Sequence, residues 1–162
     1  MKIVTCNKKW LGIFQNEKKL LKSILSTEVK AVEHIGSTAI PKMASKPIID
    51  IVVLVTSIQN QKKFFKLLKT VGYTFDEKRS SAERLFFTKG KPATFHLSLT
   101  QKKFSYWERQ IAFRNYLIAH PDYAKQYMKL KRKLIKKYPS GRGQYSYGKS
   151  GFVEMILSKS KA

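Results

Sequence analysis

The sequence is poor in cysteine and has no long apolar run. Its single cysteine, Cys6, excludes an internal disulfide and favours a reduced compartment. No apolar run approaches the ~20 residues needed to cross a bilayer, so we expect no membrane partner. The first residues, 1–5, show neither a long apolar stretch nor a small-residue cleavage site, which predicts that no signal peptide is present. We therefore expect a cytoplasmic protein.

Acidic residues are also scarce, with 10 aspartates and glutamates against 33 lysines and arginines, a net charge of +23. Such a chain attracts phosphates, in free nucleotides, nucleic acid or anionic membranes. Only 6 of the basic residues are arginine, the type favoured in bidentate phosphate sites, so part of the charge reflects a lysine-rich composition. Residues 125–137 hold seven basic side chains and no acid. This run is either a solvated helix face or a polyanion-facing surface, which makes RNA a candidate partner.

The length of 162 residues and the hydrophobic content of 43% predict one domain, 1–162, with a true core. Apolar spacing and turn residues predict helices and strands. The expected strands are 3–5, 29–35, 48–55, 73–75, 84–88 and 94–99. The expected helices are 8–25, 57–71, 105–118, one from 121 onward, and 147–157. Strands come first and three helices last, which indicates an α+β fold with a C-terminal helical cluster.

Two neighbouring segments, residues 32–41 and 46–55, carry the most informative pattern. An apolar run ends at Gly36-Ser37, where a glycine beside a small hydroxyl can turn tightly and present N–H groups and an Oγ to an anion. Asp50 then lies inside a β-branched run, where a carboxylate is costly to bury unless it is paired, protonated or bound to a cation. A hydroxyl turn followed by a strand carboxylate is typical of a phosphate-and-metal site.

The strings His34-Ile35-Gly36-Ser37-Thr38-Ala39-Ile40-Pro41 and Lys46-Pro47-Ile48-Ile49-Asp50-Ile51 resemble the GrpB family. The resemblance continues at residues 95–97, 113–121, 127–131 and 145–149, so it covers most of the chain. It implies a nucleotidyltransferase-like fold, in which helices flank a mixed β-sheet. A similar domain is appended to some dephospho-CoA kinases, whereas the family itself has no firmly assigned reaction.

Active enzymes that resemble DNA polymerase beta use two aspartates at alternate positions of one strand and a third carboxylate on a neighbouring strand. Strand residues two apart share a face, which lets the pair hold metal ions. In this chain Asp50 matches the first aspartate, but Val52 takes the second position. The neighbouring strand offers His96 and Ser98 instead of an acid. The resemblance therefore implies the fold, and the incomplete metal set argues against ordinary nucleotidyl transfer.

The remaining candidates for catalysis are Ser37, Asp50 and His96. We expect Asp50 and His96 to face one pocket beside Ser37. With His34 they form a candidate ligand set for a divalent ion such as magnesium, manganese or zinc, or they include a proton-transfer pair. In the structural alternative, Asp50 accepts backbone N–H groups of the turn and the histidines have no chemical role.

A second group of residues is predicted to bind a phosphorylated ligand. It comprises the turn residues and several cations with one aromatic side chain: Gly36, Ser37, Thr38, Lys46, Arg114, Tyr127, Lys131 and Lys149. Arg114 lies on the apolar stripe of its helix, so it either snorkels to solvent or reaches an anion in the cleft, and the resemblance favours the second. Tyr127 and Lys131 are one helical turn apart and could stack on a base and hold a phosphate.

Two functions are consistent with these residues. In the first, a nucleotidyltransferase-type cleft binds a phosphorylated small molecule, such as a nucleotide or a CoA-like compound, and supports metal-assisted transfer. In the alternative, the chain is a non-catalytic nucleotide- or RNA-binding module with an incomplete metal site. The retained Asp50 favours the first function, and the missing second aspartate favours the alternative.

Overall fold

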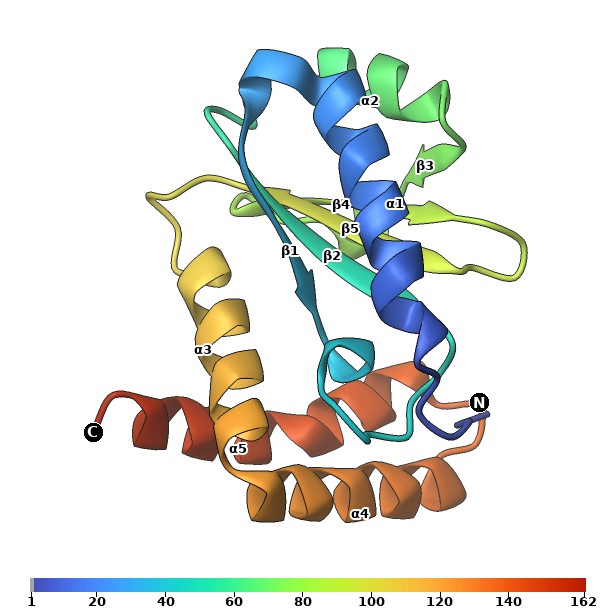
Figure 1. The fold of residues 1–162 in the computed structure, drawn as a ribbon, viewed down its shortest axis with the longest axis vertical. Coiled ribbons are helices and arrows are strands. Elements are labelled where there is room, and N and C mark those ends of the chain that lie inside the picture. The colour runs from blue at the N-terminus through green and yellow to red at the C-terminus, as the bar shows by residue number, and fades with distance from the viewer. Residues whose placement is uncertain (1) are drawn as a thin grey trace.

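The computed structural model describes residues 2–162 and is built around one five-stranded sheet (Figure 1). The strands lie in the order β1-β2-β5-β4-β3. β2 and β5 pair in parallel, and the other neighbours are antiparallel. The strand bounds are β1 Val29–Ile35, β2 Ile49–Val55, β3 Tyr73–Phe75, β4 Arg84–Lys89 and β5 Phe95–Thr100.

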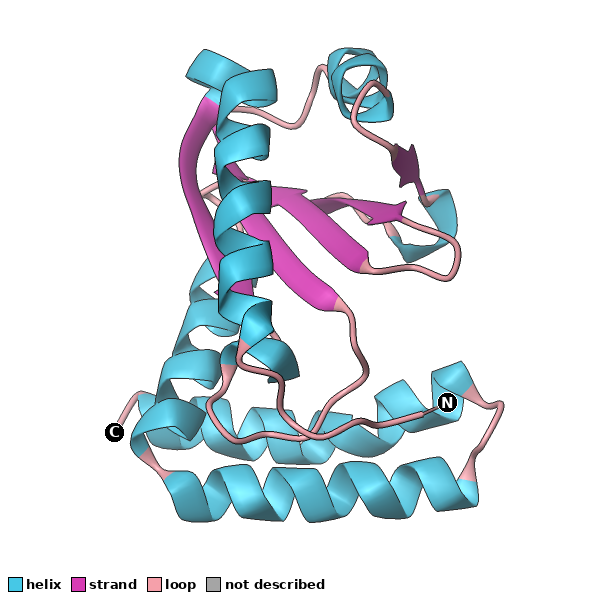
Figure 2. Cartoon of the chain, turned by 45° about the vertical axis from the view of Figure 1, so that its right-hand side comes forward, coloured by secondary structure: helices cyan, strands magenta, loops and turns pink. Residues whose placement is uncertain are grey.

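The helices divide between the two sides of this sheet (Figures 1 and 2). α1 (Lys9–Leu25) and α2 (Gln61–Lys69) pack on one face and form the larger apolar core with it. α3 (Tyr106–Ala119) contacts β1 from the other side. α4 (Pro121–Lys137) and α5 (Arg142–Ser160) run side by side beyond the end of the sheet. The sheet face opposite α1 is thus left to meet the C-terminal helices, and this is where the candidate site lies.

Burial along the two central strands follows from their sequences. Ile51 and Val53 of β2 are buried in the core on the side of α1 and α2. Because successive strand side chains alternate between faces, Asp50 projects from the opposite face. In β5 the buried Leu97 and Leu99 share the core face, so His96 and Ser98 share the face of Asp50. The near-continuous apolar run of β2 is therefore explained by burial on both faces.

The predicted α+β class, with a mixed sheet and a C-terminal helical cluster, is confirmed, and three predicted elements are wrong in detail. Residues 3–5 form no strand; Val4 makes only an isolated bridge with Ser45. The second helix begins at Gln61 and not at residue 57, because the side chain of Asn60 accepts the N–H of Lys63 at 3.4 Å and caps it. Within residues 2–162, none of the helices combines the length and the apolar character needed to cross a membrane.

The third difference is the last helix, which begins at Arg142 and not at residue 147. Its start and middle contain Gly143, Gly148 and Gly151, which weaken a helix in isolation by roughly 1 kcal/mol each. Packing overrides this propensity. A Cβ added to Gly148 would lie 2.4 Å from a methyl carbon of Leu134 in α4. The glycine therefore lets α4 and α5 approach closely, and the helix is stabilised by that contact.

Candidate functional site

The turn after β1 brings its backbone against Asp50. Gly36 has a φ of +69°, in the left-handed region that favours glycine. Ile35 and Asp50 are direct cross-strand partners, so the turn begins beside the carboxylate. A Cβ at Gly36 would lie 2.5 Å from Oδ2 of Asp50. Any other residue at position 36 would be strained at this φ and would force the turn and the carboxylate apart.

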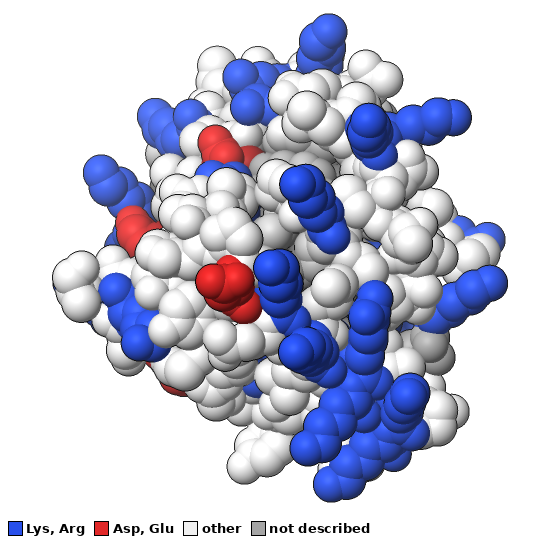
Figure 3. All heavy atoms as spheres, turned by 60° about the horizontal axis from the view of Figure 1, so that its bottom comes forward, with Lys and Arg blue, Asp and Glu red and all other residues white. Residues whose placement is uncertain are grey.

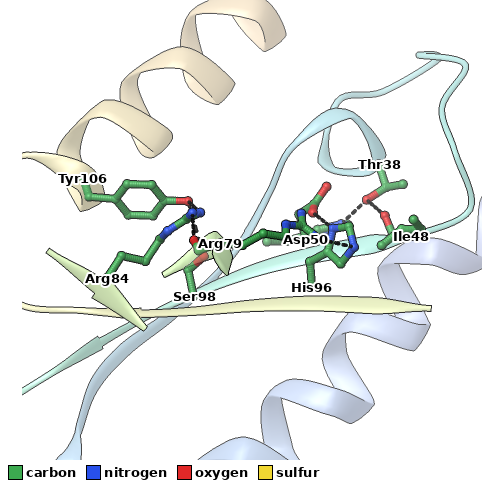
Figure 4. Close-up of polar contacts among 9 residues, drawn as sticks. Thr38, Ile48, Asp50, Arg79, Arg84, His96, Ser98 and Tyr106 are labelled. Carbon is green, nitrogen blue, oxygen red and sulfur yellow. Dashed lines mark hydrogen bonds and ion pairs between the residues drawn. The ribbon is translucent and has the colours of Figure 1, made fainter. Parts of the chain in front are cut away.

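Asp50 pairs with a histidine from the neighbouring parallel strand. His96 is its register partner in β5, and its Nδ1 lies 3.0 Å from Oδ1 of Asp50. The other ring nitrogen, Nε2, lies 3.4 Å from Nη1 of Arg79 (Figure 4). A guanidinium can only donate, so this arrangement assigns Nε2 as the acceptor and Nδ1–H as the donor to Asp50. Carboxylate and imidazole are thus arranged as a proton-transfer pair requires.

A cavity of about 280 Å³ opens in front of this pair. Its walls come from the turn after β1, from β2, β4 and β5, and from α3, α4 and α5. Gly36, Ser37, Asp50 and His96 line it together, as expected for one pocket beside Ser37. The side chain of Asp50 is 35% exposed. The carboxylate is therefore accessible to a ligand and not sealed in the core.

Lysines from the C-terminal helices approach the same turn. Nζ of Lys131 donates to Oγ of Ser37 and to the carbonyl oxygen of Ala44, each at 2.9 Å. Because Ser37 Oγ accepts this bond, its own O–H is available to donate to a ligand. The nitrogens of Lys46 and Lys149 lie 4.5 Å and 4.4 Å from the ring centre of Tyr145, so one buried ring positions two cations.

These lysines are desolvated and repel one another. Burial, followed by the charges of Lys149 and Lys46, lowers the pKa of Lys131 to about 7. Burial and then the charge of Lys46 lower the pKa of Lys149 to about 8. Asp50 opposes both shifts, but a single carboxylate does not balance three ammonium groups. An anionic ligand would relieve this repulsion.

Two predicted site residues lie on the far side of the sheet. His34 pairs with Ile51, so its ring faces α1, where it stacks on Phe14 with ring centres 4.8 Å apart. Its Nε2 is 2.8 Å from Oγ1 of Thr38, and that hydroxyl also lies 3.4 Å from the carbonyl oxygen of Ile48. Ile51, the cross-strand partner of His34, is adjacent to Asp50 in β2, and adjacent residues of a strand point to opposite faces. The prediction that His34 joins Asp50 and His96 at a metal is therefore wrong. Thr38 buttresses the turn from behind and does not line the cavity.

Arg114 and Tyr127 also differ from their predicted roles. Nη1 of Arg114 donates to the carboxylate of Glu33 at 2.6 Å and to the carbonyl oxygen of His34 at 2.8 Å. This arginine therefore ties α3 to β1 and does not point into the cavity. The ring of Tyr127 touches the cavity but is 6% exposed and packs between Phe113 and Phe152. The prediction that Tyr127 stacks on a base is wrong, because the rings of Phe113 and Phe152 already cover it.

The residues present do not fit a two-metal centre. Val52 is apolar and His96 stands where a third carboxylate is expected, so only Asp50 and His96 remain as donors. Across residues 2–162, no three side chains of histidine, cysteine, aspartate or glutamate come together as a metal-binding group. The two donors are already bonded to each other, and cations surround them. Catalysis through a pair of protein-held ions therefore has no support in this geometry.

The structure adds three cavity residues that the sequence patterns do not reveal: Arg79, Arg84 and Tyr106. Arg79 lies in the short 3₁₀ helix η3 (Glu77–Arg79), and Arg84 begins β4. Arg84 and Tyr106 form a polar group with Ser98, separate from the Asp50–His96 pair (Figure 4). Only the scarcity of arginine in so basic a chain could have drawn attention to these positions.

Comparison with known proteins now adds to this geometry. The family model described as "GrpB protein" matches residues 1–159. The chain belongs to the GrpB family. The UPF0157 protein YqkA of Bacillus subtilis is 38% identical over 162 residues, which cover 99% of this chain and 47% of that protein. The chain thus spans about half the length of this relative.

Solved structures support the family and its fold. The crystal structure of the conserved protein GrpB from Enterococcus faecalis matches with a TM-score of 0.88 at 31% identity, over 98% of this chain and 96% of that one. Terminal uridylyl transferase 4 from Trypanosoma brucei matches with a TM-score of 0.60 at 13% identity, over 96% of this chain and 54% of that one. The GrpB chain therefore has a nucleotidyltransferase-like fold, and at that identity the second likeness concerns the fold alone.

Proposed function

We propose that the cleft of this GrpB-family chain binds a phosphorylated small molecule, a nucleotide or a CoA-like compound. One observation carries the proposal: Lys131 donates to Ser37, Lys149 lines the cavity beside that turn, and Lys46 shares the ring of Tyr145 with Lys149, while burial and neighbouring cations lower the pKa values of all three. A phosphate placed there would accept hydrogen bonds from Lys149 and the Ser37 hydroxyl, which line the cavity, and would be attracted by the charges of Lys46 and Lys131 behind them. The cavity of about 280 Å³ provides room for the ligand in front of Asp50.

The Asp50–His96 pair extends the proposal to chemistry. When a ligand draws Arg79 away from Nε2, His96 can exchange a proton with a ligand hydroxyl or water through that nitrogen, while Asp50 orients the ring through Nδ1 and stabilises its charged form. A divalent ion is not needed for phosphate binding in this account. An ion that arrives with the ligand's phosphates would find one carboxylate, Asp50, and one imidazole, His96.

The test is a thermal-shift and calorimetric screen of nucleotides and CoA derivatives, with and without magnesium, manganese or zinc. We expect phosphorylated compounds to raise the melting temperature, and Lys149→Gln to weaken the best of them by about 10-fold, the range for one charge-assisted hydrogen bond. Lys129→Gln, on the exposed face of α4, is the matched control and should bind as the wild type does. A screen without any stabilising phosphorylated compound would contradict the proposal.

Asp50→Asn separates a catalytic cleft from a binding module. If the cleft supports metal-assisted transfer, this variant loses metal-dependent binding and turnover but stays folded. If the cleft only binds, the variant keeps or gains affinity, because a negative charge beside the phosphate is removed. Circular dichroism of the variant establishes that the fold is intact.

A second candidate function, RNA binding, is favoured by the outer face of α4. Lys125, Lys129, Lys133 and Lys136 are exposed, and basic side chains gather densely on the face that carries this helix (Figure 3). Reversing Lys129, Lys133 and Lys136 to glutamate should weaken binding of a single-stranded RNA and flatten its dependence on salt. An unchanged salt slope would remove this candidate.

A further inference from the structure

Arginine is concentrated around the cavity. The chain has 27 lysines and 6 arginines, yet Arg79, Arg84 and Arg109 all line this one cavity. Arg109 is paired with Glu154, whereas no carboxylate within residues 2–162 forms an ion pair with Arg79 or Arg84. The planar guanidinium matches phosphate oxygens in a way that an ammonium does not. Asp76 and Asp50 act on Arg79 only from beyond ion-pair distance, so in a lysine-rich chain two arginines without a direct ion pair at one cavity indicate a requirement for that geometry.

The segment that carries both arginines is held in place by its own hydrogen bonds. Ser80 Oγ donates to the carbonyl oxygen of Asp76 at 2.7 Å and accepts the N–H of Phe86 at 2.9 Å. The backbones of Ser81 and Arg84 bond to each other in both directions. Both arginines therefore extend from a braced turn, which lowers the entropic cost of binding a ligand.

Arg84 is further fixed by its own side chain. Its Nη1 donates to the hydroxyl of Tyr106 at 3.0 Å, and its Nη2 donates to the carbonyl oxygen of Arg79 at 2.5 Å (Figure 4). A guanidinium has five N–H groups, so most of its donors are not used by these two bonds. The guanidinium carbons of Arg79 and Arg84 also lie 3.9 Å and 4.9 Å from the ring centre of Phe86, which supports both cations.

The arginines continue a contact series that begins at the Gly-Ser turn. Gly36 abuts Asp50, Asp50 bonds His96, and His96 lies within 3.4 Å of Arg79, which accepts a bond from Arg84. In this series of contacts Lys131 lies at the Ser37 end and the two arginines at the other end, with the Asp–His pair between them. We propose that Arg79 and Arg84 form a second anion subsite, so that the cleft takes a ligand with a diphosphate or longer polyphosphate chain. This inference rests on the proposed function for the first phosphate.

Calorimetric titration with inorganic pyrophosphate and with inorganic phosphate, in the presence of a chelator, tests this subsite. We expect the wild type to bind pyrophosphate more tightly than phosphate. Arg79→Lys and Arg84→Lys keep the positive charge but lose the planar guanidinium that can donate two parallel hydrogen bonds to a phosphate. Each variant should therefore lower the affinity for pyrophosphate by about 10-fold and leave the affinity for phosphate little changed. Arg132→Lys, on the exposed face of α4, is the matched control and should have no effect.

Equal binding of pyrophosphate by the wild type and both lysine variants would overturn the subsite, as would failure of the wild type to prefer pyrophosphate. Arg79 is exposed, so Arg79→Lys should stay folded even if Arg84→Lys does not. The two proposals fail separately. If nucleotides bind but both lysine variants bind pyrophosphate as tightly as the wild type, only the subsite proposal is wrong. If pyrophosphate binds through the arginines but no nucleotide or CoA compound displaces it, the proposed ligand class is wrong and the subsite proposal is retained.

Discussion

At the scale of single residues, the face to which a side chain points decides its role. His34 and His96 look equivalent in the sequence, since each lies in a strand close to the motif that carries Asp50. The register places His96 beside Asp50 and His34 beside Ile51, on the opposite face. Sequence alone does not fix the register of two strands that are distant in the chain. For this reason the sequence could not show that His34 lies apart from the cavity that Ser37, Asp50 and His96 share.

Burial of His34 makes stability depend on pH. Burial lowers its pKa from 6.5 to about 4, the charge of Asp50 partly opposes the shift, and Arg114 adds to it. The unfolded chain therefore binds the proton more readily, so stability is lost as the pH falls from about 6.5 toward about 4, by at most about 3 kcal/mol. Urea unfolding of the wild type and of His34→Gln across this range should show a smaller loss in the variant. Parallel curves would contradict the assignment.

The lysines of the cleft link ligand binding to protons. At about pH 8, Lys149 and Lys131, with pKa values of about 8 and about 7, are partly or largely deprotonated. A bound triphosphate favours their charged forms, so binding should take up protons and weaken as the pH rises above about 8. Calorimetry in buffers of different ionisation enthalpy measures this uptake directly. Lys149→Gln should reduce it, and binding without net proton uptake would show that these lysines do not meet the ligand.

At the scale of elements, local patterns predicted most of the fold. Alternation and apolar runs placed β1, β2 and β3 closely because one or both strand faces are buried. The last helix was predicted five residues too short at its start, since glycines conceal it. Its stability depends on the contact between Gly148 and Leu134, which the sequence does not display. The sequence likewise does not display the positions of Arg79 and Arg84 at the cavity, because these positions depend on how η3 and β4 pack and not on any local pattern.

The contact between α4 and α5 gives a test at this scale. Gly148→Ala places a methyl group against Leu134, and we expect it to reduce the free energy of unfolding by about 1–3 kcal/mol, the usual cost of overpacking. Gly151→Ala lies in the same helix with nothing within 4 Å of the added Cβ, so it should be neutral or stabilise by about 0.5–1 kcal/mol. Denaturant unfolding compares the two. Equal effects would mean that the helices do not approach this closely in solution.

At the scale of the whole molecule, the positive charge is distributed over two different surfaces. The cleft holds cations that are partly buried and oriented by hydrogen bonds, whereas the lysines of α4 are exposed to solvent. Salt screens exposed charges far more than buried ones. We therefore expect affinity for a nucleotide in the cleft to fall little between about 50 and about 200 mM salt, and any RNA bound on α4 to be lost steeply. Titrations of both ligands at the two salt concentrations test this difference, and equal slopes would contradict it.

The most direct test of the cleft is a ¹⁵N–¹H NMR titration of the labelled chain with a nucleoside triphosphate and with a CoA compound. We predict that the largest shift changes fall on the amides of Gly36 and Ser37, with further changes at Asp50 and Lys149, and few along the exposed face of α4. Changes confined to α4, or none with either compound, would contradict the claim that this cleft receives phosphate.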